Sequence, residues 1–81
     1  MKVDYNTPRV VEALRVAPES VRKAFFKQVR FLAEGLRHPS LRAKKYDEAN
    51  DIWQARINRD WRFYFIIEGD TYIVLDVIPH P

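Results

Sequence analysis

Residues 52–65 constrain the fold of this chain more than any other stretch, because apolar and polar residues alternate through most of them. The alternation is interrupted only at 58–60, as in two β-strands joined by a tight turn. A three-residue loop at 58–60 would place Arg56 directly opposite Arg62 on the polar face of the hairpin. Like charges in opposed positions destabilise a sheet, so this register predicts an anion between the two guanidinium groups.

Composition limits the class of protein. The chain has 81 residues, of which 47% are hydrophobic, and these can form the core of one small domain. With no cysteine and two separated histidines, neither a metal nor another cofactor is expected. No apolar run is long enough for a membrane span, and the first five residues lack a signal-peptide core. We therefore expect a soluble cytoplasmic protein with no membrane partner.

The net charge of +3 conceals a strong asymmetry along the chain. Residues 22–45 contain eight basic residues and one acidic residue, whereas residues 46–81 contain three basic and seven acidic residues. This division predicts one side that faces a polyanion and another that stays solvated. The alternative is a lysine-rich helix face that only keeps the protein in solution.

The first half of the chain predicts a strand and two helices. Residues 2–5 form a short strand candidate, and Thr7 with Pro8 gives the cap and first position of a helix. That helix ends before Pro18, which opens a second helix whose apolar residues follow three- and four-residue spacing as far as Gly35. Together the two helices are expected to form a helical hairpin.

The second half predicts a sheet. We interpret residues 37–51 as a loop, with or without a helical turn, and residues 72–78, apolar on both sides, as the central strand. Pro79 is expected to end the pairing. The sum is an α+β fold in the order βααβββ: a small twisted, mostly antiparallel sheet of about four strands with the N-terminal helical hairpin on one face. The residues expected beneath the helices are Trp53, Trp61, Phe63 and Phe65.

The open face would carry Arg56, Arg62 and Tyr64. A guanidinium group stays charged and matches the geometry of a phosphate, so the two arginines predict an anion site that also stabilises charge on a phosphoryl group. The alternative for Arg56 is an internal ion pair with an acidic residue, for which the candidates are Asp47, Glu48 and Asp76. Tyr64 is a candidate platform for an unpaired base, although tyrosines in hairpins more often serve packing.

Three further residues are candidates for proton transfer. Lys44 and Lys45 precede the hairpin, and a basic cleft would lower the pKa of either ammonium group. The alternative is a solvated pair of loop lysines. His80 follows the last strand, and histidine exchanges protons near neutral pH, although a frayed terminal residue is an equally simple interpretation.

The assembled pattern resembles the RelE/ParE superfamily of bacterial toxins from type II toxin–antitoxin modules, in particular its RelE-like branch. The residues that carry the resemblance are 52–65, the turn at 68–71, the closing residues 75–80, and residues 39–42 with Lys44 and Lys45. With the helical hairpin, the resemblance covers nearly the whole chain as a single domain, residues 1–81.

The resemblance implies a ribosome-dependent mRNA endoribonuclease that inhibits translation without a metal. In this reaction the ribose 2′-hydroxyl attacks the adjacent phosphate, which requires a base, an acid and charge stabilisation. No glutamate stands where YoeB-like members have a catalytic one, so proton transfer would rest on the lysines and the histidine. The implied catalytic residues are Lys44, Lys45, Arg56, Arg62 and His80. The implied RNA-binding residues are Lys27, Arg30, Arg42, Arg59 and Tyr64.

The resemblance also implies partners, namely the ribosome with its mRNA and a cognate antitoxin that wraps over the basic surface. Antitoxin segments are typically acidic and fold on binding, which suits the basic region 22–45. One alternative is a non-enzymatic ParE-like protein whose partner is DNA gyrase. Another is a catalytically weak module of the same fold that only binds its antitoxin.

Overall fold

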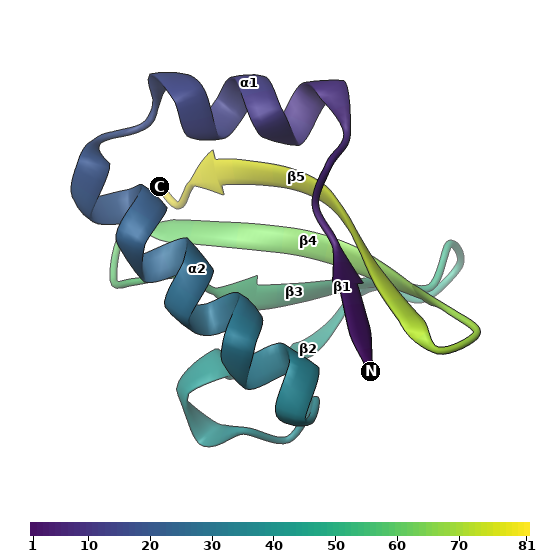
Figure 1. Ribbon diagram of the computed structural model, residues 1–81. Helices are drawn as coiled ribbons and strands as arrows, with labels where there is room; N and C mark the ends of the chain where they lie inside the picture. The colour runs from purple at the N-terminus through teal and green to yellow at the C-terminus, as the bar shows by residue number, and fades with distance from the viewer.

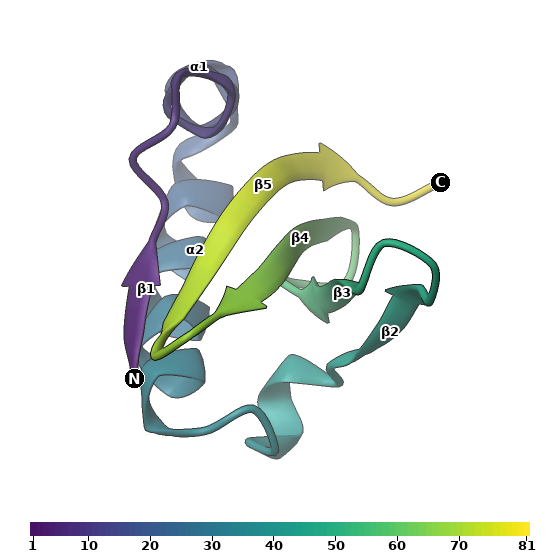
Figure 2. The same ribbon diagram turned by 90° about the vertical axis from the view of Figure 1, so that its right-hand side faces the viewer.

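The computed structural model describes residues 1–81 as a five-stranded sheet with two helices on one face (Figures 1 and 2). The strand order is β1-β5-β4-β3-β2, in which β1 pairs with β5 in parallel and the other neighbours are antiparallel. No helix is long and apolar enough to cross a membrane. In chain order the elements are β1 (Lys2–Asp4), α1 (Pro8–Val16), α2 (Glu19–Glu34), the 3-10 helix η1 (Pro39–Leu41), β2 (Lys44–Asp47), β3 (Ile52–Arg56), β4 (Trp61–Glu68) and β5 (Thr71–Pro79).

Both helices begin and end where their boundary residues predict. Thr7 caps α1, its hydroxyl accepting a hydrogen bond from the backbone N–H of Val10 at 3.4 Å. Helix α1 ends before Ala17 and α2 ends before Gly35. The Arg22 guanidinium on α2 donates hydrogen bonds to the carbonyls of Leu14 and Ala17, so this side chain satisfies carbonyls at the C-terminal end of α1.

The core lies between the two helices and the strands β3, β4 and β5, and α1 contributes Val10 and Leu14 to it. Phe63 and Phe65, from alternate positions of β4, are fully buried, as is Phe25 of α2. The Phe25 and Phe63 rings meet edge to face with centroids 5.4 Å apart, a geometry that adds attraction beyond burial. The predicted inward face of the hairpin is thus confirmed, with Trp53 and Trp61 partly buried at its margins.

A one-residue bulge in β5 adds a side chain to the open face. Tyr64 of β4 pairs with Asp76, but Phe65 pairs with Val74, so Leu75 is an extra residue in the ladder. Val74 and Val77 can therefore both face the core, while Leu75 and Asp76 lie together on the open face. The apolar pattern of residues 72–78 correctly indicates a strand with neighbours on both sides, although β4 is the central one.

The expectation of about four strands is wrong by one, because part of the expected loop at 37–51 is β2. Its residues Lys44 and Lys45 pair with Gln54 and Trp53 of β3, and the register shifts before Asp47. The strand is short, charged and at the edge of the sheet, where such features discourage pairing with other chains. Because β2 is short and three of its four residues are charged, its sequence does not show the alternation of apolar and polar residues that identifies a strand. The helical turn at η1 falls within the expected loop.

Candidate functional site

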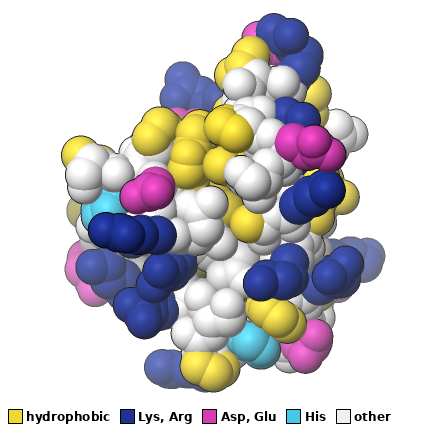
Figure 3. Space-filling view, turned by 90° about the vertical axis from the view of Figure 1, so that its left-hand side faces the viewer, with side chains coloured by type: hydrophobic (Ala, Val, Ile, Leu, Met, Phe, Trp, Pro, Cys, Tyr) yellow, Lys and Arg dark blue, Asp and Glu magenta, His cyan; other side chains and the backbone are white.

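A pocket lined only by polar residues lies on the open face of the sheet, with a volume of about 240 Å³. No acidic residue lines it. Three segments contribute to it, namely the η1–β2 turn with the first residue of β2, the β3–β4 hairpin and the residue after β5. Figure 3 shows basic side chains gathered beside a histidine at this end of the molecule. We call this the basic pocket, and its residues are Arg42, Lys44, Gln54, Arg56, Arg62 and His80.

The structure brings five of the ten predicted site residues together in this pocket: Arg42, Lys44, Arg56, Arg62 and His80. The other five lie elsewhere. Lys27 and Arg30 are exposed on α2, in the layer on the opposite side of the sheet, and Arg59 is exposed in the β3–β4 loop. Tyr64 lines a neighbouring groove, and Lys45 points away from the pocket.

The predicted register of the hairpin is confirmed, because Arg56 pairs directly with Arg62. The Arg62 guanidinium is held by backbone carbonyls of the loop, with Nη1 donating to Asn58 at 2.8 Å and to Trp61 at 2.9 Å. Its charge is therefore oriented but not neutralised by a carboxylate. Two unneutralised guanidinium groups on facing strands have the charge and geometry that suit an anion.

The alternative in which Arg56 forms an internal ion pair is wrong. None of the salt bridges in the structure includes Arg56 or Arg62. Asp76 instead pairs with Arg9 at 3.2 Å, and Asp47 accepts hydrogen bonds from Asn50. The positive charge of the basic pocket is thus available to a ligand.

His80 is anchored at the pocket although it lies next to the last residue of the chain. Its backbone N–H donates to the carbonyl of Asp60 at 2.6 Å, one step beyond the Trp61–Pro79 pair that closes the β4–β5 ladder. Backbone pairing therefore continues past Pro79, where it was expected to end. The hydrogen bond keeps the imidazole beside the β3–β4 loop and the arginines of the hairpin.

Lys45 belongs to a different environment from Lys44, because consecutive strand residues point to opposite faces. Its ammonium group lies 2.9 Å from Asp51 and 3.8 Å from Glu48, and 5.0 Å from the ring centre of Trp53. The hydrogen bond to Asp51 raises the pKa of Lys45, so the expectation of a lowered pKa is wrong. A raised pKa opposes any role of this side chain as a base.

Arg42 joins the pocket through an unusual backbone conformation. It ends η1 with φ 46° and ψ 44°, in the left-handed region that residues other than glycine rarely occupy. The chain thereby turns sharply between η1 and β2 and brings Arg42 close to Lys44. Strained residues of this kind concentrate at functional sites.

A buried amide, which the sequence interpretation missed, connects the segments that form the pocket. Gln28 of α2 is only 2% exposed. Its Nε2 donates to the carbonyls of Arg56 at 2.7 Å and Ser40 at 3.0 Å, and its Oε1 accepts from the Ser40 hydroxyl at 3.0 Å. The signal was present, because Gln28 shares the apolar stripe of α2 with Phe25 and Leu32, and a polar residue in such a stripe requires buried partners.

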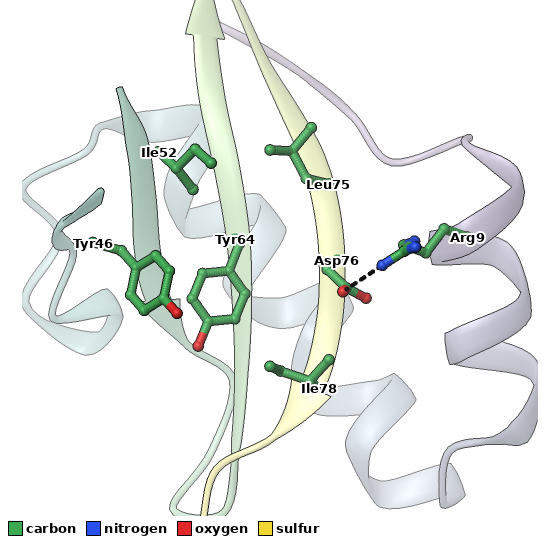
Figure 4. Close-up of a pocket in the computed structure, with 7 residues that line it drawn as sticks. All are labelled: Arg9, Tyr46, Ile52, Tyr64, Leu75, Asp76 and Ile78. Atoms are coloured by element: carbon green, nitrogen blue, oxygen red, sulfur yellow. Dashed lines mark hydrogen bonds and ion pairs between the residues drawn. The ribbon is translucent and has the colours of Figure 1, made fainter. Parts of the chain in front are cut away.

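A second cavity, of about 420 Å³, adjoins the basic pocket on the same face of the sheet (Figure 4). The rings of Tyr46 and Tyr64 meet there edge to face, with centroids 4.8 Å apart. Burial, and secondarily Tyr46, raise the pKa of Tyr64 above its usual value. We call this cavity the aromatic groove, and its residues are Arg9, Tyr46, Ile52, Tyr64, Leu75, Asp76 and Ile78.

These groups suit one kind of chemistry. Guanidinium groups bind phosphate oxygens and stabilise charge that develops on them. An ammonium and an imidazole group beside them are able to move protons. No group of three or more His, Cys, Asp or Glu side chains lies together in the way that a metal site would require.

No protein-family model matches the sequence, and no curated protein sequence matches it either. Solved structures do match in fold. A YoeB/ParE toxin from Agrobacterium tumefaciens has a TM-score of 0.75 at 12% identity, with all of both chains covered. A chain of the archaeal RelE–RelB complex from Pyrococcus horikoshii OT3 has a TM-score of 0.72 at 21% identity, over 96% of this chain and 92% of that one.

A third structure, the RelB–RelE antitoxin–toxin complex from Methanococcus jannaschii, gives the same result. Its TM-score is 0.69 at 18% identity, over 98% of this chain and 89% of the matched chain. All three matches extend over nearly the full length of the domain. The chain therefore has the fold of the RelE/ParE toxins, which confirms the expected α+β architecture.

Proposed function

We propose that this protein is the toxin of a type II toxin–antitoxin module and cleaves mRNA on the ribosome. The observation that carries the proposal is the basic pocket. Arg56 and Arg62 face each other there, Lys44 and His80 lie in the same pocket, and no carboxylate lines it. The RelE-like fold supports the same assignment. We further propose that the protein acts in the cytoplasm, where its substrate lies.

In the proposed reaction the 2′-oxygen of a ribose attacks the adjacent phosphorus atom, and the bond from phosphorus to the 5′-oxygen of the next nucleotide breaks. The products are a 2′,3′-cyclic phosphate and a free 5′-hydroxyl. The 2′-hydroxyl gives its proton to a base, and an acid returns a proton to the departing 5′-oxygen. Arg56 and Arg62 would hold the non-bridging oxygens as their charge increases. Lys44 and His80 are the pocket residues proposed for the two proton transfers.

The test is to map transcript ends on ribosomes after induction in cells. Removal of one preorganised charge in such sites typically costs about 10²- to 10³-fold in rate, so Arg62→Ala is expected to abolish detectable cleavage. Lys44→Ala is expected to reduce it strongly. Lys45→Ala is the matched control, since the neighbouring lysine faces away from the pocket, and it should retain cleavage.

Undiminished cleavage by Arg62→Ala would refute the site assignment. Filamentation with a DNA-damage response, and no new transcript ends, would favour the alternative of a ParE-like DNA gyrase inhibitor. A protein without either effect would be a catalytically weak binding module. The three outcomes therefore separate the candidate functions.

An antitoxin is the proposed protein partner, and two of the matched structures are complexes of RelE with RelB. The basic pocket contains no acidic side chain to oppose an acidic segment of such a partner. We propose that the antitoxin covers this pocket and blocks access of RNA. In that case antitoxin binding should weaken as salt rises, and Arg42→Ala should weaken it further.

A further inference from the structure

The aromatic groove and the basic pocket form one continuous surface. Two cross-strand pairs link them. Arg62 of the basic pocket is paired with Ile78 of the groove, and Gln54 of the basic pocket is paired with Tyr64 of the groove. The second pair is also joined by a hydrogen bond, in which the Tyr64 hydroxyl donates to Gln54 Oε1 at 3.3 Å.

The spacing of the two sites suits adjoining parts of one nucleotide. On β3 and β4, the pair of arginines and the pair formed by Gln54 and Tyr64 are two residues apart and face the same side. Two residues of a strand span about 7 Å. A phosphate held by the arginines would therefore carry its sugar and base toward the groove.

The walls of the groove suit a flat, mainly apolar group. Tyr46 is 62% exposed and lies edge to face with Tyr64, so it offers a ring surface to a ligand. Ile52, Leu75 and Ile78 supply apolar walls, and the volume of about 420 Å³ exceeds that of any base. As Figure 4 shows, Tyr46 and Tyr64 lie side by side, with the Arg9–Asp76 ion pair at the opposite margin.

We propose that the aromatic groove is a nucleobase subsite, which receives an unpaired base attached to the phosphate in the basic pocket. This inference rests on the proposed function and specifies how the RNA lies. The basic pocket also suits the acidic antitoxin segment proposed above, so charge alone does not select the occupant, whereas a mainly apolar site about 7 Å along the strands from a phosphate site matches the base of the same nucleotide. Every base also has a π face, so stacking on tyrosine needs no particular sequence.

The experiment measures the affinity of the purified protein for a short 2′-O-methyl RNA, which has no free 2′-hydroxyl and cannot be cleaved. Fluorescence anisotropy would compare this RNA with a series that carries one abasic residue at each position in turn. Tyr46→Ala should weaken binding of the complete RNA roughly 5- to 150-fold, the range found for loss of one stacked base. Tyr46→Phe, which keeps the ring, should bind as the unchanged protein does.

The matched control is Phe26→Ala, because Phe26 is an exposed aromatic residue (40%) on the helical layer. It should leave RNA affinity unchanged. Among the abasic series, one RNA should bind the unchanged protein weakly, and its affinity should not fall further in Tyr46→Ala. The abasic position of that RNA would identify the base that lies in the groove. Equal sensitivity at every abasic position would overturn the proposal.

Unchanged RNA affinity in Tyr46→Ala would also overturn it, and is the result expected if a protein segment occupies the groove. Failure of the proposed function gives a different pattern. Transcripts would then stay intact on ribosomes, while the dependence of RNA binding on Tyr46 and on one base would remain. An absence of all RNA binding would overturn the nucleobase subsite, whereas the proposed function is decided by the transcript ends on ribosomes.

Discussion

Replacement of Gln28 by leucine should destabilise the protein far more than the same replacement at an exposed neighbouring position. The substitution keeps a side chain of similar size but removes three hydrogen bonds with Ser40 and Arg56. Each such bond contributes about 0.5–1.5 kcal/mol net, so the expected loss is about 2–4 kcal/mol. A chain of this length has a total stability of about 4–12 kcal/mol, so the loss is a large fraction of it.

The effect is large because no strand residue lies beside the end of β3. Strand β2 begins at Lys44, opposite Gln54, so it stops short of Arg56. The Gln28 amide replaces the missing strand there, and leucine would leave the Arg56 carbonyl without its donor. An unpaired buried carbonyl loses its hydration without compensation.

Urea denaturation followed by the fluorescence of Trp53 and Trp61 measures this loss. The midpoint should fall with little change in slope, and the melting temperature should fall by about 8–32 °C. Lys27→Leu is the control, because its exposed neighbouring position should change stability by less than about 0.5 kcal/mol. A loss below about 0.5 kcal/mol in Gln28→Leu would refute the role assigned to the amide.

A second variant, Gln28→Glu, tests the direction of the hydrogen bonds. A carboxylate still accepts from the Ser40 hydroxyl but cannot donate to the two carbonyls. Burial and the facing carbonyl oxygens would raise the pKa of the new carboxyl group in the folded state. Stability should therefore be greater below the pKa of the unfolded chain and should decline as the pH rises through the folded pKa. Pairs of urea curves at acidic and neutral pH would show a gain in acid relative to the unchanged protein.

Three further predictions concern residues outside the Gln28 hydrogen bonds. Arg22→Ala leaves the last carbonyls of α1 without donors, so urea denaturation should show a loss of about 1–3 kcal/mol. Since burial raises the pKa of Tyr64, ultraviolet titration should show one tyrosine that ionises above the usual value of about 10 and that is missing in Tyr64→Phe. Asn50 lowers the pKa of Asp47, so Asn50→Ala should reduce stability at neutral pH, and the difference should vanish as the pH falls through the folded pKa of Asp47.

The sequence carries enough information to predict the hairpin and the helix boundaries. Alternation on both sides of residues 58–60 determines which side chains face inward, and the length of the loop determines that Arg56 meets Arg62. Thr7 and Pro18 similarly identify helix ends through local chemistry. Interactions of this kind depend on near neighbours in the chain, so they can be predicted before any tertiary structure is known.

The choice between Lys44 and Lys45 could not be predicted from the sequence. It depends on which of them faces the open side, and this is determined only by the pairing of β2 with β3. A shift of one residue exchanges the two faces of a strand. The short strand gives no alternation to determine this register, and Tyr46 lies where the register shifts.

The aromatic groove could not be predicted from the sequence either, because its residues come from α1, β2, β3, β4 and β5. Tyr64 was identified as a possible platform, but its partner Tyr46 was not. Tyr46 reaches the groove only through the edge strand that sequence reasoning missed. A site built from distant segments requires the complete fold before its members can be recognised.

Because of the extra residue in β5, a wall of the aromatic groove can change without a change in the basic pocket. Leu75 has no partner of its own in β4. On either side of it, Val74 faces the core and pairs with Phe65, and Asp76 lies on the open face and pairs with Tyr64. A chain that lacked this position would therefore keep an ordinary ladder and would still bring His80 to Asp60. One wall of the groove could then be gained or lost during evolution by a single-codon insertion or deletion, with the arginine pair undisturbed.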